Sequence, residues 1–231
     1  MTRSPSQNRY ASPPCLAGEI AADYFDPGAI DPQQAIDVAR WRHAERKRLR
    51  GERDSISVAD RRGAGEALSS VLRVELDVRF AGASRSVLSG YWPIKGEPDL
   101  RPVLGELHAL GATIVLPVVE TRNAPLVFRR WTPQTKMAIG NWKIPVPPPE
   151  CEQFTPDIVL APLVGWDAAG YRLGYGGGYF DRTLAALVPR PFSIGIGFQS
   201  ARLATIFPLP HDIPLDLILT ENGPQPISRE A

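Results

Sequence analysis

The segment best suited to chemistry is a run of four glycines at positions 174, 176, 177 and 178. Glycines let backbone N–H groups approach a phosphate closely, and a helix beginning directly after them adds the positive end of its dipole. Arg172, before this run, supplies a planar cation suited to phosphate oxygens, and Asp181, after it, supplies a hard oxygen ligand for Mg²⁺. The pattern therefore predicts a site for a phosphate group and its magnesium ion.

The glycines alone leave a second interpretation open, in which they only form a tight turn and Asp181 is a solvated helix residue. Glycine clusters are common in proteins, and their presence is therefore moderate support for a phosphate site. No Gly-Lys-Ser/Thr follows, as a Walker A loop would require, and the spacing is not that of a dinucleotide-binding fingerprint.

A basic segment lies between Arg40 and Arg53, where seven basic residues stand against two glutamates. Arg42, Arg46 and Arg50 are four residues apart, so that a helix places their guanidinium groups in one stripe. The stripe fits a solvated helix face, a nucleic-acid patch or an anion clamp. Charge runs are most often solvated, and the segment alone does not decide among the three.

A third candidate segment contains Trp92 and Glu97, which follow a predicted strand and precede a predicted helix. Trp92 offers a flat surface on which a heterocycle can stack, and Glu97 can accept hydrogen bonds from the N–H groups of such a ring. The alternative is a core tryptophan and a glutamate that favours a helix start.

These segments must be positioned by alternating helices and strands. A helix is expected from Asp31–Pro32 to a stop at Gly51, and a second helix is expected to begin at Ser57 with Asp60 three residues on. The remaining elements follow as strands over 86–91, 113–119, 126–131, 157–161, 193–198 and 215–220, helices from 99 and near 179–187, and a rigid proline-rich loop over 144–156.

This alternation predicts an α/β fold: a single three-layer α/β/α domain with an open, mainly parallel sheet. Its expected limits are 31–224, with an irregular N-terminal arm over 1–30 and a C-terminal tail over 225–231. Ligands of such sheets bind beyond the carboxyl ends of the strands, where the glycine run and Glu97 are both expected.

Composition narrows the class of function. A net charge of +1 gives no overall field that would recruit nucleic acid or an anionic membrane, and any polyanion must be held by a local cluster. No apolar run approaches the roughly 20 residues that span a bilayer. Two cysteines are too few for a disulfide framework or a structural zinc site. We therefore expect a cytoplasmic protein without a membrane partner.

The string from Pro162 to Arg182 resembles, nearly residue for residue, the signature of the 5-formyltetrahydrofolate cyclo-ligase (5,10-methenyltetrahydrofolate synthetase) family. That signature runs Pro, an apolar stretch, Asp, two residues, Gly-x-Arg-Leu-Gly, a glycine-rich turn and Gly-Tyr-Tyr-Asp. Phe180 replaces the second tyrosine, which preserves the ring and loses a hydroxyl.

Other segments are similar to the same family in the expected order. They are a basic residue followed by Leu-Arg at 46–50, Tyr-x-Pro-x-x-x-Glu at 91–97, Gln199, His-Asp-x-Pro-x-Asp at 211–216, and Thr-Glu at 220–221. The resemblance extends from about Arg42 to Glu221. It fails at Val146, where many relatives carry glutamate before the proline, so that no glutamate contact is expected there.

The resemblance implies a set of site residues. The residues that it assigns to ATP are Arg46, Arg50, Arg172, Leu173, Gly174, Tyr175, Gly176, Gly177, Gly178, Tyr179 and Phe180. Arg172 and Tyr179 are also the implied catalytic residues. Trp92 and Glu97 are assigned to the pterin of the folate, and Asp181 and Asp212 to Mg²⁺.

The implied reaction is the ATP-dependent cyclisation of 5-formyltetrahydrofolate to 5,10-methenyltetrahydrofolate, with release of ADP and phosphate. No nucleic-acid partner is expected, and the chain is expected to be a monomer or a weak homo-oligomer. Two other functions compete with this one: a non-catalytic nucleic-acid-binding or regulatory relative, and a sugar-phosphate-handling α/β enzyme. The second would need a catalytic lysine or acid pair near the glycines, and the sequence offers no obvious lysine base.

Overall fold

Two long helices open the part of the chain that the computed structural model describes, residues 32–228; the predicted arm and Asp31 lie outside it. The helices are α1 (Pro32–Ser55) and α2 (Val58–Phe80). The predicted cap of α2 is confirmed, because the Ser57 hydroxyl accepts the N–H of Asp60 at 3.1 Å. The predicted end of α1 at Gly51 is wrong. Buried contacts of Arg53 hold the last turn and offset the roughly 1 kcal/mol that a helical glycine costs.

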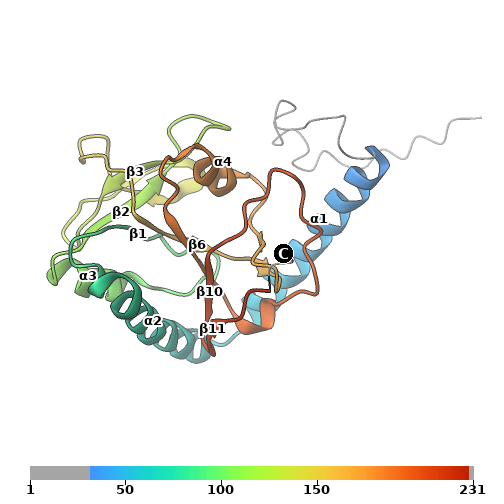
Figure 1. Cartoon of the computed structure of the whole chain (residues 1–231), viewed down its shortest axis with the longest axis horizontal. Helices are drawn as coiled ribbons and strands as arrows, with labels where there is room; N and C mark the ends of the chain where they lie inside the picture. Colours follow the sequence, from blue (N-terminus) through green and yellow to red (C-terminus); the bar gives the residue numbers. More distant parts are fainter. Residues whose placement is uncertain (1–31, 229–231) are drawn as a thin grey trace, which may run out of the picture.

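A seven-stranded sheet forms the centre of the molecule, in the order β11-β10-β9-β6-β1-β2-β3 (Figure 1). The five strands from β10 to β2 are parallel, and β11 and β3 are antiparallel at the edges. Their bounds are β1 (Val87–Ser89), β2 (Thr113–Val118), β3 (Val127–Arg130), β6 (Ile158–Pro162), β9 (Phe192–Ile196), β10 (Leu217–Thr220) and β11 (Gly223–Gln225). The predicted α/β class with a mainly parallel sheet is confirmed.

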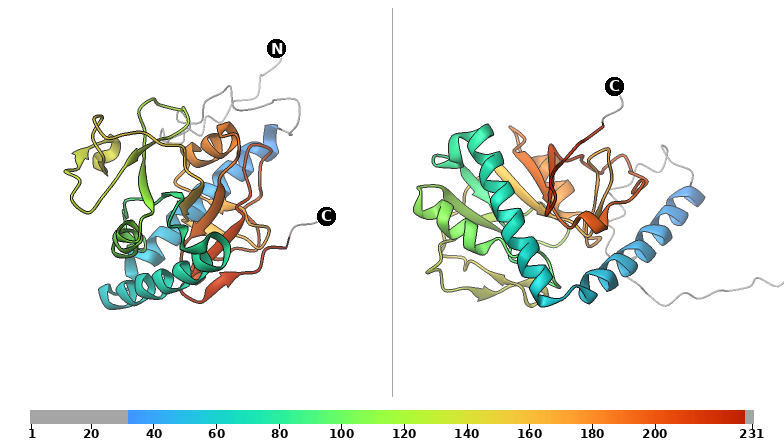
Figure 2. Two further views of the ribbon diagram at one scale, coloured as in Figure 1. Left: turned by 60° about the vertical axis from the view of Figure 1, so that its left-hand side comes forward. Right: turned by 90° about the horizontal axis from the view of Figure 1, so that it is seen from below.

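Helices cover both faces of this sheet. Leu160 on β6 faces the core formed with α2 and α3 (Arg101–Ala109), and Val159, one residue earlier, faces the cluster beneath α4 (Tyr179–Ala186). In Figure 2, α1 and α2 form a V whose arms flank the C-terminal strands. Within residues 32–228, no helix combines the length and apolar character needed to cross a bilayer.

Small elements complete the fold. Two hairpins, β4–β5 (Ala138–Ile139 and Pro145–Val146) and β7–β8 (Gly165–Trp166 and Arg172–Leu173), were not predicted as strands. The 3₁₀ turns of the described residues are η2 (Ala81–Ala83), η3 (Asn141–Lys143) and η4 (Gln199–Ala201). The chain stays attached to the sheet beyond residue 224, since Gln225 pairs in β11 and the Ser228 N–H donates to the Ala168 carbonyl at 2.8 Å. The limits of the domain remain predictions.

The strand order creates a switch point between β1 and β6. These two strands are neighbours, yet the chain leaves β1 toward β2 on one side and leaves β6 toward β9 on the other. Their carboxyl ends therefore lie at the point where the chain turns to opposite sides, which is where open α/β sheets bind ligands. The segment after β1 carries Trp92 and Glu97, and the segment after β6 carries the glycine run. Topology alone thus brings the two candidate segments together.

We expect truncation of Leu72 to test the α2 side of the core. Leu72 is fully buried in the cluster between α2, α3 and the sheet, so Leu72→Ala should lower the free energy of unfolding by about 2–5 kcal/mol through lost burial and a cavity. Val78 on the same helix is 78% exposed, and Val78→Ala should change the free energy of unfolding by less than about 0.5 kcal/mol. Urea unfolding measures both; equal losses would contradict this assignment of the core.

Candidate active site at the switch point of the sheet

The glycine run forms a loop that ends at the first turn of α4. Gly176 and Gly178 have φ values of +107° and +62°, in the left-handed region that side chains disfavour. A side chain at Gly174 would place its Cβ 2.7 Å from the Arg172 guanidinium. The glycines therefore allow both a turn of unusual backbone and a close approach of arginine to the loop. Gly178 stands at the N-cap of α4, so the positive end of this helix faces the loop.

The arginine stripe of α1 faces this loop. Arg42 is 7% exposed and donates to the Ile206 and Phe207 carbonyls at 3.0 and 2.8 Å. Arg46 donates from Nε to the Gly174 carbonyl at 2.7 Å. The interpretation of the stripe as a solvated face is therefore wrong, since its cations are packed against the protein and one of them holds the glycine loop.

Burial changes the proton affinity of Arg46, the middle residue of the stripe. Desolvation, together with the nearby cations Arg42 and Arg172, lowers the pKa of Arg46 to about 10, although Asp212 opposes the shift. Arg46 still carries its charge at neutral pH. A half-buried cation crowded by two others is stabilised by an arriving anion, which is the electrostatic condition for binding phosphate.

Two buried ion pairs are found here, one made by Arg42 of the stripe and one made by Arg172 beside it. Arg172, 8% exposed, contacts Asp181 at 2.5 Å, and Arg42 contacts Asp212 at 2.5 Å. The Oδ1 atom of Asp181 also accepts the N–H of Ile213, next to Asp212, at 3.3 Å, so that the two carboxylates belong to one cluster. The sequence pattern did not predict that each candidate metal ligand would be paired with an arginine.

The donor chemistry of this cluster fits Mg²⁺ carried by a nucleotide. Mg²⁺ commonly takes one or two protein carboxylates and completes its six ligands with phosphate oxygens and water. Asp181 and Asp212 supply two carboxylates, and residues 32–228 contain no cluster of three side chains that could hold a metal without such help. Their arginine partners must share or release them to a cation. Metal binding at these two residues stays a prediction.

Glu97 lies beside the glycine loop, in contact with Tyr175, and is 4% exposed. Its Oε2 accepts the Ile94 N–H at 2.9 Å, and its Oε1 accepts the Tyr175 hydroxyl at 2.9 Å. Burial raises the pKa of this carboxyl, and the two hydrogen bonds oppose the shift. Trp92 is half-buried, and the Arg101 guanidinium lies 4.6 Å from its ring centroid. A cation therefore already stacks on Trp92.

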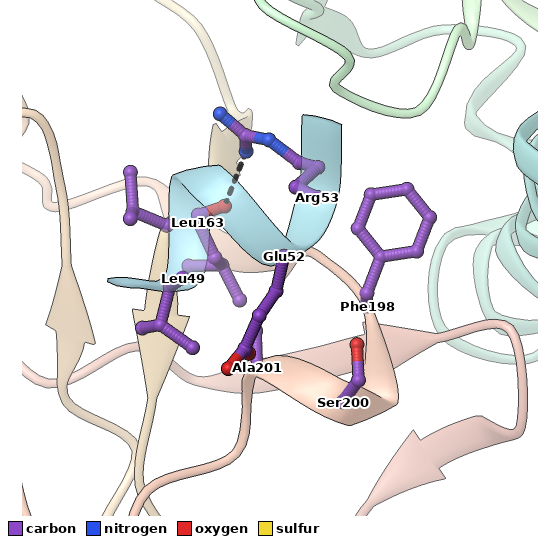
Figure 3. A pocket seen from close by; sticks show the side chains of 8 residues that line it. Leu49, Glu52, Arg53, Leu163, Phe198, Ser200 and Ala201 are labelled. Atoms are coloured by element: carbon purple, nitrogen blue, oxygen red, sulfur yellow. Dashed lines mark hydrogen bonds between the residues drawn. The ribbon is translucent and has the colours of Figure 1, made fainter. Parts of the chain in front are cut away.

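Three residues at the site were not assigned to it from the sequence. Arg53 is 6% exposed and donates to the Leu163 carbonyl at 3.3 Å, above a small pocket that Leu49 and Phe198 also line (Figure 3). The signal was available, because Arg53 continues the arginine stripe three residues beyond Arg50. Lys95 lies 5.3 Å from the Tyr175 ring centroid. A lysine therefore does lie beside the glycine loop.

Trp142 is the third such residue, and it lies at the tip of the β4–β5 hairpin. Its ring packs edge-on against Tyr179 at 5.7 Å, where α4 begins. The backbone of Trp142 has a φ of +54°, which nothing in the sequence indicated. This contact brings a distant hairpin to the predicted catalytic tyrosine.

The fold and the site define an open-sheet α/β protein with a cationic ligand site at its switch point. Residues 38–221 match the 5-formyltetrahydrofolate cyclo-ligase family. The 5-formyltetrahydrofolate cyclo-ligase of Mycolicibacterium smegmatis is 31% identical over 182 residues, which cover 76% of this chain and 91% of that relative. The Escherichia coli K12 enzyme of the same name is 36% identical over 94 residues, 38% of this chain and 52% of that relative.

A solved structure agrees with this match. The NMR structure of Aquifex aeolicus 5,10-methenyltetrahydrofolate synthetase has a TM-score of 0.67 and 28% identity, and it covers 82% of this chain and 94% of that one. The chain belongs to the 5-formyltetrahydrofolate cyclo-ligase family.

The raised pKa of Glu97 predicts a pH-dependent effect of Glu97→Gln on stability. A carboxyl whose pKa is higher in the folded protein ionises first in the unfolded chain, so its contribution is full below the unfolded pKa and falls as pH rises through the folded pKa. Glu97→Gln removes that loss. It should gain stability relative to wild type between pH 4 and pH 7, measured by urea unfolding, while exposed Glu150→Gln should not. A constant difference across this range would contradict the desolvation of Glu97.

Proposed function

We propose that this chain converts 5-formyltetrahydrofolate and ATP to 5,10-methenyltetrahydrofolate, ADP and phosphate. The family to which it belongs supports this activity, and the site supports it in its particulars. One observation carries the proposal: arginines and a glycine loop suited to phosphate lie against a buried carboxylate suited to a pterin, and Tyr175 contacts both sides. A reaction between ATP and a folate requires two such subsites next to each other.

The reaction requires activation of the N5-formyl carbon, which is a poor electrophile. The N5-formyl group is amide-like, and its oxygen is a poor leaving group. When this oxygen attacks the γ-phosphorus of ATP, the bond from that phosphorus to the bridging oxygen breaks and ADP leaves. N10 then attacks the activated carbon, the C–O bond breaks, phosphate departs and N10 loses its proton. The protein need supply no nucleophile, so positioning and charge neutralisation carry catalysis.

The residues of the cluster fit these tasks. Arg46, Arg50, Arg172 and the amides of residues 173–180 would receive the phosphates. Arg172 is suited to the transferred phosphoryl group because its guanidinium is buried and its Nε has no hydrogen-bond partner among the described residues. Tyr179, at the start of α4, would complete the catalytic pair. Glu97 would accept N–H groups of the pterin, with Trp92 beside it.

Mg²⁺ would be held by Asp181 and Asp212 together with the phosphates, and when bound it would neutralise charge on the transferred group. The arginine partners of both carboxylates supply charge balance before the nucleotide arrives. Exchange of carboxylate for phosphate on Arg172 would free Asp181 for the metal. The Arg172 guanidinium would thus bind Asp181 when nucleotide is absent and a phosphate when nucleotide is present.

The competing functions receive less support. The inward packing of the α1 arginines removes the surface stripe on which a nucleic-acid-binding role depended. Lys95 gives a sugar-phosphate enzyme a lysine near the loop, but this lysine is exposed, and its ammonium lies over the Tyr175 ring at 5.3 Å. A cytoplasmic location and a monomer or weak homo-oligomer are part of the proposal.

An absorbance assay for methenyltetrahydrofolate tests the activity, with 5-formyltetrahydrofolate and Mg²⁺ present and ATP added or withheld. Product should form only with ATP. Arg46→Met should lower kcat/KM for ATP by ~10- to 100-fold, because it removes a charge-assisted contact. Arg48→Met is the matched control on the same helix, since Arg48 is exposed and pairs with Glu45 and Glu52. Absence of product from folded protein would refute the proposed activity, and equal effects of the two variants would refute the role of Arg46.

Binding of Mn²⁺ as a substitute for Mg²⁺ tests the metal site without turnover. Electron paramagnetic resonance should show weak binding to the protein alone and tighter binding with a non-hydrolysable ATP analogue, because phosphates complete the ligand set. Asp181→Asn should weaken the second by about tenfold or more, since it removes the charge and keeps the acceptor for the Ile213 N–H. Exposed Asp54→Asn is the control. Unchanged Mn²⁺ binding in Asp181→Asn would remove Asp181 from the metal site.

A further inference from the structure

Tyr175 joins three separate segments that meet at the switch point of the sheet. Its hydroxyl lies 2.6 Å from the Arg53 guanidinium of α1 and 2.9 Å from Oε1 of Glu97, which follows β1. The residue itself belongs to the glycine loop after β8. The hydroxyl therefore accepts from Arg53 and donates to Glu97, and both of its partners are less than 7% exposed.

The same ring is surrounded by positive charge. The cations of Arg50, Arg53 and Lys95 lie 5.9, 5.8 and 5.3 Å from its centroid. Cations attracted to the face of a ring hold it in place, in addition to the hydroxyl contacts. Burial and the nearby Glu97 carboxylate raise the pKa of Tyr175, so the phenol keeps its proton and remains a donor.

In this arrangement each oxygen of Glu97 already accepts one hydrogen bond. Oε2 is taken by the Ile94 N–H and Oε1 by Tyr175, and a 4% exposed side chain has little room for a further donor. A pterin offers adjacent N–H donors that match the two oxygens of a carboxylate. A ligand that binds Glu97 through both oxygens therefore competes with the Tyr175 hydroxyl for Oε1 and with the Ile94 N–H for Oε2.

We propose that Tyr175 is a latch: its hydroxyl occupies the folate acceptor Glu97 in the free protein, and its displacement by folate releases the glycine loop for the phosphates of ATP. This inference rests on the proposed function and adds a coupling between the two substrates. The mechanical link is short. Tyr175 follows Gly174, whose carbonyl holds Arg46, and precedes Gly176 at φ +107°. Movement of the Tyr175 ring must therefore pass to the loop backbone and to a phosphate-binding arginine.

The proposed latch predicts that removal of the Tyr175 hydroxyl strengthens folate binding, whereas removal of a hydroxyl with a structural role alone would not. Tyr175→Phe keeps the ring and its cation contacts and removes only the competitor for Glu97. Folate should then bind more tightly when nucleotide is absent, with a Kd ~3- to 10-fold lower, because the Tyr175 hydrogen bond no longer has to be broken. Loss of a merely structural contact would weaken binding or leave it unchanged.

The coupling gives a second, independent readout. In the wild-type protein a non-hydrolysable ATP analogue should lower the Kd for 5-formyltetrahydrofolate, and folate should lower the Kd for the analogue by the same factor. In Tyr175→Phe that factor should fall toward 1, since the loop is already released. Titration calorimetry with each ligand, alone and with the other at saturation, measures all four constants.

Tyr171→Phe is the matched control. It makes the same chemical change four residues away in the same segment, and its hydroxyl contacts neither Glu97 nor Arg53. It should behave as wild type, and thermal melting of both variants checks that the fold is kept. Unchanged or weaker folate binding in folded Tyr175→Phe, with the wild-type coupling factor, would overturn the latch.

The outcome for the wild-type protein separates this inference from the proposed function. A wild-type chain that binds folate and turns it over, while Tyr175→Phe behaves identically, refutes the latch alone. A wild-type chain that neither binds 5-formyltetrahydrofolate nor forms product refutes the proposed function, and the latch with it.

Discussion

The burial of one arginine-bearing face of α1 against the carboxyl ends of the parallel strands is the constraint on which the site depends. Arg42 and Arg53 are 7% and 6% exposed, and removing such cations from water is costly unless carbonyls and carboxylates replace the solvent. The partners come from the loops that meet at the switch point, among them the carbonyls of Ile206, Leu163 and, for Arg46, Gly174. The hydrogen bonds that the buried arginines of α1 require therefore also hold in place the loops that we propose bind the ligands.

That constraint also explains why carboxylates and arginines are paired in the empty site. Asp181 and Asp212 neutralise Arg172 and Arg42, but more cations than anions gather here, and burial together with this surplus lowers the pKa of Arg46. Removing either carboxylate would leave a buried guanidinium uncompensated, which costs several kcal/mol. An incoming phosphate relieves the surplus instead of creating a new imbalance. The cluster is thus stable without ligand and still favourable to an anion.

The sequence predicted features that depend on neighbouring residues, whereas features that depend on contacts between distant residues were not predicted. The Ser57 cap, the parallel strands and the glycine turn follow from short-range signals, and all three are present. Gly51 was misread because the contacts of Arg53 that carry α1 past it lie more than 100 residues away. The β7–β8 hairpin has two-residue strands, too short for any period to appear. The Arg42–Asp212 pair, separated by 170 residues, has no sequence signal.

Tyr175 illustrates how the topology of the sheet brings residues that are distant in the sequence into contact. The glycine loop and the Glu97 segment are 78 residues apart, and they meet because β1 and β6 are adjacent at the switch point. A glycine loop that followed a strand not adjacent to β1 would lie away from Glu97, the proposed pterin contact. A reaction in which one substrate must be phosphorylated by the other benefits when neither subsite is complete alone. Under the proposed latch, the switch point supplies that dependence through Tyr175, because its hydroxyl and the folate would compete for the same oxygen of Glu97.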